Sequence, residues 1–79
     1  MEIDLDKIDD AVLALLHLTS FTEHGVTRAW KGHDWNALNR LHEKGFISEP
    51  RSKVKSILFS DEGAKRAGEL FNKLFTKVS

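Results

Sequence analysis

Side chains that often carry chemistry are present in this sequence, but their spacing does not assemble a catalytic or metal site. The histidines are His17, His24, His33 and His42. No two of them have the close spacing that a helical zinc site uses. There is no cysteine, which excludes disulfides, thiolate metal sites and cysteine nucleophiles. No nucleophile stands beside an obvious general base, and no glycine-rich phosphate loop occurs. We therefore expect no enzyme, no metal and no cofactor, and the sequence identifies no small-molecule substrate.

A second set of residues has the chemistry of DNA recognition. Asparagine pairs with adenine and arginine with guanine through two hydrogen bonds, and basic side chains hold phosphates. The candidate DNA-binding residues are Arg28, Lys31, Asn36, Asn39, Arg40, Arg51, Lys53 and Lys55. A solvated helix face carries the same residue types, and Glu43 on that face repels phosphate. Both interpretations therefore stay open at the level of sequence.

The charge balance is asymmetric, although twelve basic and twelve acidic residues cancel overall. Residues 1–20 contain five acidic residues against Lys7 alone, whereas residues 51–79 contain seven basic residues against three acidic ones. Such a chain can present a basic patch while staying neutral, but it lacks the net excess of a strong nonspecific polyanion binder. Acidic residues at a first helix and basic residues at a last one also suit the helix dipole.

Hydrophobic spacing predicts helices that would position these side chains. Apolar residues recur every three or four positions over residues 6–19, with Asp4 or Asp6 as the cap. A short helix is predicted over 26–31, with Val26, Ala29 and Trp30 inward. Residues 35–44 form a clearer helix, capped by Asp34 and ended by Gly45.

The second half of the chain predicts a hairpin and a last helix. Phe46-Ile47 and residues 54–59 are apolar or alternating and flank a basic turn, which indicates two short strands. The register of the second strand is open, because Val54 and Leu58 compete with Ile57 and Phe59 for the inner face. Ser60 caps a final helix over 61–78.

The two tryptophans, Trp30 and Trp35, stand at helical spacing from apolar residues, which favours a place in the core. Stacking on a base, or filling a pocket on a partner, is the alternative.

The first and last helices are apolar over more than one face, which in a domain of this size suggests a second subunit. The candidate interface residues are Leu13, Leu70, Phe71, Leu74 and Phe75. We expect a homodimer, without knowing which helix builds it.

Two segments resemble the recognition helix and wing of MarR-like and PadR-like winged-helix regulators. The first is Leu38-Asn39-Arg40-Leu41-His42-Glu43-Lys44-Gly45-Phe46-Ile47, and the second is Ile57-Leu58-Phe59-Ser60-Asp61-Glu62-Gly63. The whole chain also resembles a short bacterial family of unknown function. The matching segments are Asp9-Asp10-Ala11-Val12-Leu13, Arg28-Ala29-Trp30-Lys31, Asp34-Trp35, Leu41-His42-Glu43-Lys44-Gly45, Lys53-Val54-Lys55-Ser56 and Glu62-Gly63. This second resemblance implies no established activity, but it suggests that the chain is a complete protein.

The resulting expectation is a single winged-helix domain over residues 1–79, mainly α with a small β hairpin. Its expected function is that of a DNA-binding transcriptional regulator that reads double-stranded DNA with helix 35–44 and wing 50–56. The alternative is a winged-helix protein-interaction module that binds no DNA. An acidic N-terminus and the lack of a long apolar stretch predict a cytoplasmic protein with no membrane partner. The sequence does not specify a DNA site, an effector or a partner protein.

Overall fold

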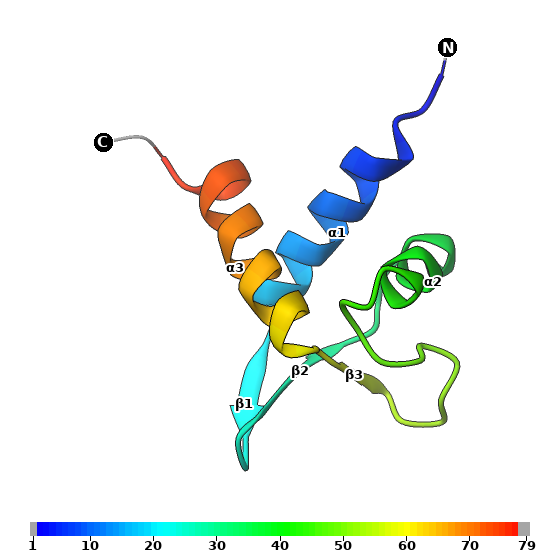
Figure 1. The fold of residues 1–79 in the computed structure, drawn as a ribbon, viewed down its shortest axis with the longest axis vertical. Coiled ribbons are helices and arrows are strands. Elements are labelled where there is room, and N and C mark those ends of the chain that lie inside the picture. Colours follow the sequence, from blue (N-terminus) through cyan, green and yellow to red (C-terminus); the bar gives the residue numbers. More distant parts are fainter. Residues whose placement is uncertain (1, 78–79) are drawn as a thin grey trace.

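The computed structural model describes residues 2–77 and places three helices on one side of a small antiparallel sheet (Figure 1). The elements in chain order are α1 (Leu5–Leu18), β1 (Phe21–Glu23), β2 (Val26–Trp30), α2 (Trp35–Glu43), β3 (Ser56–Leu58) and α3 (Asp61–Phe75). Strand order in the sheet is β1-β2-β3. The prediction of a mainly helical protein with a small β element is therefore confirmed.

The predicted short helix over 26–31 is wrong, because these residues form strand β2. β2 pairs with β1 through a two-residue turn in which His24 has φ 51° and Gly25 has φ 80°. Two successive positive φ values are typical of the turn whose twist suits a tight β-hairpin. The signal was present in the sequence, since an x-Gly pair separates two runs rich in β-branched and aromatic residues.

The predicted hairpin between 46 and 59 is present only in reduced form. Ile47 and Phe59 make a single antiparallel bridge, and the amide of Ser48 donates to the carbonyl of Leu58 at 2.8 Å. The main partner of β3 is β2, with Ala29 opposite Ile57. Ile57 is buried and Val54 is exposed, which settles the open register in favour of Ile57 on the inner face.

The predicted helix caps are confirmed. Side chains of Asp4, Asp34 and Ser60 accept hydrogen bonds from backbone amides in the first turns of α1, α2 and α3. After α2, Gly45 adopts φ 83°, and the amide of Phe46 donates to the carbonyl of Leu41 at 3.1 Å. That bond closes the left-handed helix end that favours glycine.

The core lies between the three helices and the inner face of the sheet. Its largest fully buried apolar side chains are Leu13, Leu16, Leu38, Leu41 and Ile57. The tryptophans are not part of it, contrary to the prediction: the exposed fractions are 57% for Trp30 and 53% for Trp35. Trp30 is outside because β2 is a strand, in which alternate side chains point to opposite faces.

The helix-turn-helix pair of a winged-helix domain is not formed within residues 2–77. A strand, not a helix, precedes α2, and α1 and α2 are separated by the β1–β2 hairpin. α2 packs on α1 and buries Leu38 and Leu41, but it has no companion helix that would cross a DNA backbone beside it in the described part of the chain.

Candidate nucleic-acid interface

The buried carboxylate of Asp9 on α1 binds two basic side chains of α2 and its C-terminal cap. Both oxygens of Asp9 accept from Nε of Arg40 at 2.9 Å, and Nη2 of Arg40 lies 2.8 Å from Oδ1. Nζ of Lys44 lies 3.0 Å from Oδ2 and also 3.4 Å from Asp6. Asp9 is fully buried, so a residue type that is almost never buried unpaired has its charge compensated here.

The contacts among Asp9, Arg40 and Lys44 shift the pKa of each of these three residues toward the charged form. Burial raises the pKa of Asp9, but hydrogen bonds from Arg40 and Lys44 together with their charges outweigh burial and lower it below its ordinary value. The hydrogen bond to Asp9 raises the pKa of Arg40. Burial lowers the pKa of Lys44, but the hydrogen bonds to Asp9 and Asp6 and their charges outweigh burial and raise it above its ordinary value. The Asp9 carboxylate is therefore ionised at neutral pH.

The pairing places Arg40 differently from the sequence-based expectation. Its guanidinium faces α1 and is committed to Asp9, so it does not project from α2 as a free base-reading group. The other predicted reading residues lie nearer solvent: Asn36 is exposed and Asn39 half-buried, and Glu43 is exposed on the same helix. No local signal in the sequence pairs Arg40 with a residue 31 positions earlier.

Lys31 and Arg28 are also engaged in contacts within the chain. Nζ of Lys31 donates to the carbonyls of Pro50 at 2.7 Å and Ser52 at 2.6 Å, and it lies 5.9 Å from the ring centre of Trp35. Arg28 donates from Nη1 to the hydroxyl of Ser56 at 3.3 Å and is half-buried. Lys31 therefore fastens the loop between α2 and β3 to the end of β2.

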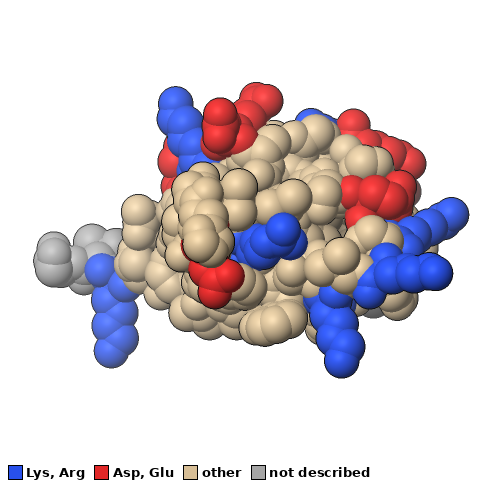
Figure 2. Space-filling model, turned by 90° about the horizontal axis from the view of Figure 1, so that it is seen from below, with Lys and Arg blue, Asp and Glu red and all other residues tan. Residues whose placement is uncertain are grey.

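That loop, residues 49–55, carries the remaining candidates. Arg51, Lys53 and Lys55 are exposed, and none of them has a salt bridge within the described part of the chain. Figure 2 shows basic side chains gathered on the side of the molecule where this loop lies, with acidic side chains beside them. An exposed cation without a salt-bridge partner can bind phosphate without first breaking an internal ion pair.

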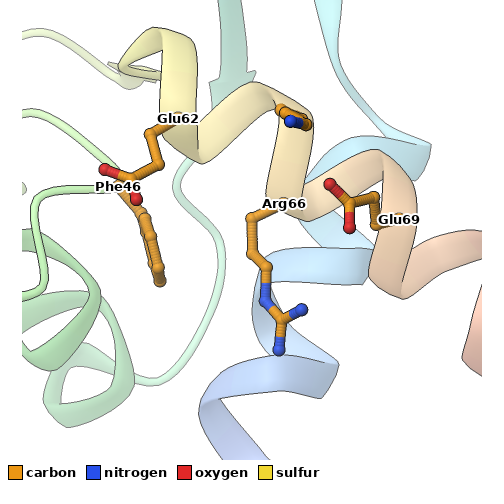
Figure 3. Close-up of a pocket in the computed structure, with 5 residues that line it drawn as sticks. Phe46, Glu62, Arg66 and Glu69 are labelled. Atoms are coloured by element: carbon orange, nitrogen blue, oxygen red, sulfur yellow. The ribbon is translucent and has the colours of Figure 1, made fainter.

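Two hollows open on the surface near α3. One, of about 310 Å³, is lined by Phe46, Glu62, Lys65, Arg66 and Glu69. Figure 3 shows Arg66 extending from α3 between Phe46 and Glu69. Its lining is of mixed charge, with two acidic and two basic side chains around Phe46. Across residues 2–77 no three metal-ligating side chains of the His, Cys, Asp or Glu type come together.

The predicted dimer residues fall into three groups, and part of the prediction is wrong. Leu13 and Leu70 are buried within the chain, so they offer no surface to a second subunit. Phe71 is half-buried, with its ring centre 5.2 Å from that of His17. Only Leu74 and Phe75 are exposed, and they line a second hollow, of about 450 Å³, between α1 and α3.

Comparison with known proteins identifies the family. Residues 4–77 match the family model described as "Domain of unknown function (DUF6429)", and the chain belongs to that family. A relative from the bacterium Sinorhizobium fredii, described as "Uncharacterized protein y4hR", is 57% identical over 77 residues, covering 98% of this chain and all of the relative. No solved structure matches. In the described part of the chain, no helix is long and apolar enough to cross a membrane.

Proposed function

We propose that this protein binds nucleic acid through the loop at residues 49–55 and acts as a small DNA-binding transcriptional regulator. The observation that carries the proposal is the loop itself, which presents three exposed cations (Arg51, Lys53 and Lys55) on a backbone held in place by Lys31. Because Lys31 already holds the loop in place, less conformational entropy is lost when the loop binds phosphate.

Fewer observations support sequence-specific binding of duplex DNA by α2. Asn36 and Asn39 remain accessible for base contacts, whereas Arg40 would have to leave Asp9, whose buried carboxylate would then keep only Lys44 as its partner. The main effect of substituting Arg40 would therefore be a lower stability of the fold, and not a changed preference for DNA sequence. Phosphate contacts by the loop are the better supported half of the regulator proposal.

The test is a titration of fluorescent random-sequence oligonucleotides, single-stranded and duplex, at about 50 mM and about 200 mM salt. We expect binding at the lower salt that weakens steeply at the higher one. The triple variant R51A/K53A/K55A should bind poorly. A matched control, K65A/R66A/K73A, removes the same charge from α3 and should bind like the parent. No binding of either oligonucleotide at the lower salt would refute the proposal.

A protein-interaction module is the second candidate, and one observation favours it. The outward side of α1, which ordinarily would be polar, carries Ile8, Leu15 and Leu18, all partly or largely exposed. They recur at helical spacing and form one stripe. Such a stripe suits a partner helix, including that of a second copy, and a homodimer remains a proposal on this ground.

Sedimentation of the parent and of L15E/L18E tests the second candidate. If the α1 stripe builds a dimer, the parent should sediment as a dimer and the variant as a folded monomer. The control is E62Q, an exposed change on α3 away from that stripe. A monomeric parent at high concentration would contradict self-association through α1.

A further inference from the structure

The outer face of the sheet, away from the helices, carries side chains that are unusual for a solvent-facing surface. On β2, Val26, Arg28 and Trp30 alternate with Ala29, which is buried in the core. On β1, Phe21 lies opposite Arg28 and Glu23 opposite Val26. On β3, Ser56 lies opposite Trp30 and Leu58 opposite Arg28. Directly paired residues share a face of the sheet, so these seven residues form one surface, in which Ser56 is buried by its neighbours. We call it the outer sheet face.

Two aromatic rings dominate the outer sheet face. The ring centres of Phe21 and Trp30 lie 5.5 Å apart, tilted by 39°, and the exposed fraction of Trp30 is 57%. Phe21 supports the indole from one side while the rest of it meets solvent. An exposed ring held by a neighbour is a ready surface for stacking, and nucleobases of every sequence have a flat π-face that fits it.

The strands themselves are neutral, and the basic charge near these rings comes from the loop. Arg28 is the one basic residue in the three strands and Glu23 the one acidic residue. The chain leaves the sheet beside Trp30 directly into the basic loop, because Lys55 precedes Ser56, the cross-strand partner of Trp30. The amide of Lys31 donates to the carbonyl of Lys55 at 3.2 Å, which keeps this end of the loop against β2. The backbone of the basic loop therefore ends beside Trp30, at the edge of the outer sheet face.

We propose that the outer sheet face binds unpaired bases of single-stranded nucleic acid, stacked on Trp30 and Phe21, while Lys53 and Lys55 contact the adjoining phosphates. This inference rests on the proposed nucleic-acid binding and adds the strand state to it. In a duplex each base is already stacked and paired, so its π-face is not available to Trp30. A duplex can offer only phosphates to the loop, whereas a single strand can use both parts of the surface.

The test compares a fluorescent twelve-nucleotide thymidine strand with a duplex of equal length, at about 50 mM salt. The single strand should bind more tightly. Trp30→Ala should weaken single-strand binding about tenfold or more and leave duplex binding unchanged. Trp35→Ala is the matched control, because it removes an equally exposed tryptophan that lies on α2, outside the outer sheet face. Trp30→Phe, which keeps a ring, should retain most of the affinity.

The other outcomes are distinguishable. Glu23→Gln removes the acidic group of the strands from an exposed position and should tighten single-strand binding even if Trp30→Ala disturbs the fold. Equal binding of strand and duplex, with Trp30→Ala and Glu23→Gln both neutral, would overturn the stacking proposal while phosphate binding by the loop stands. No binding of either oligonucleotide would overturn both proposals.

Discussion

The carboxylate of Asp9 and the guanidinium of Arg40 join α1 to α2 through two nitrogens of the guanidinium. Nε lies 2.9 Å from each carboxylate oxygen, and Nη2 lies 2.8 Å from Oδ1. This ion pair fixes how the two helices pack, and it takes the single arginine of α2 out of any role that needs a free guanidinium. The proposed nucleic-acid binding is therefore assigned to the loop and the sheet and not to α2.

Removing the charge of Asp9 should destabilise the protein. Asp9→Asn leaves Arg40 and Lys44 without their shared carboxylate, and both retain some contact with water, so we expect a loss of about 1–3 kcal/mol in the free energy of unfolding. Urea denaturation measures this. Asp6→Asn is the control, because the Asp6 side chain is 89% exposed and its weak contact with Lys44 should contribute about 0–1 kcal/mol. Equal stability of the two variants would contradict the role given to Asp9.

The same carboxylate makes stability depend on pH. The pKa of Asp9 is lower in the folded chain than in the unfolded one, so its contribution is present above the unfolded value, about 3.9, and is lost as the pH falls below it through the folded value. The stability difference between the parent and Asp9→Asn should therefore be largest at neutral pH and should shrink at about pH 3. Denaturation curves at both pH values check this, and a difference that grows on acidification would refute it.

Gly63 is the site of the closest approach between α3 and the chain after α2. A Cβ at this position would lie 1.9 Å from the carbonyl oxygen of Phe46, which is backbone and cannot move aside as a side chain could. We expect Gly63→Ala to cost about 3 kcal/mol, measured by thermal unfolding.

Gly68 on the same helix provides the matched control for Gly63. A Cβ there meets only His17, at an ordinary 3.5 Å. Gly68→Ala should therefore stabilise the helix, by about 0.5–1 kcal/mol. A Gly63→Ala variant as stable as Gly68→Ala would show that α3 does not approach Phe46 in this way.

Lys31 should control the order of the basic loop. Lys31→Met removes the two hydrogen bonds to the carbonyls of Pro50 and Ser52, so tryptic cleavage after Arg51, Lys53 or Lys55 should become about tenfold faster, since a tenfold shift in local opening needs only about 1.4 kcal/mol. Lys65→Met on α3 is the control and should leave the rate at the loop unchanged. Unaltered cleavage in Lys31→Met would mean that other contacts hold the loop.

The sequence predicted the helices well because their signals are local. Caps such as Asp34 and Ser60, the spacing of Leu38 and Leu41, and Gly45 each act within a few residues. The β2 segment was mistaken for a helix because Val26, Ala29 and Trp30 fit both periods over so few residues. Because this segment is a strand and not a helix, Trp30 lies on the surface and not in the core.

The candidate site was predictable only in part, for a related reason. Arg51, Lys53 and Lys55 are exposed as a polar turn suggests, whereas Arg40 and Lys31 are held by groups distant in sequence. In the sequence, Asp9 looks like an ordinary acidic residue in the first turn of a helix, and the residues around it do not indicate that it is buried. Leu13 and Leu70, predicted at an interface, are needed by the core of the chain itself.

The most direct test of the account is an amide and indole NMR titration of the isotope-labelled protein with a short thymidine oligonucleotide at low salt. We predict that the largest shifts fall on residues 51–55 and on the indole N–H of Trp30, with the outward side of α1 unaffected. Shifts confined to Leu15, Leu18 and their neighbours, or no shifts at any residue, would contradict nucleic-acid binding at the loop and the outer sheet face.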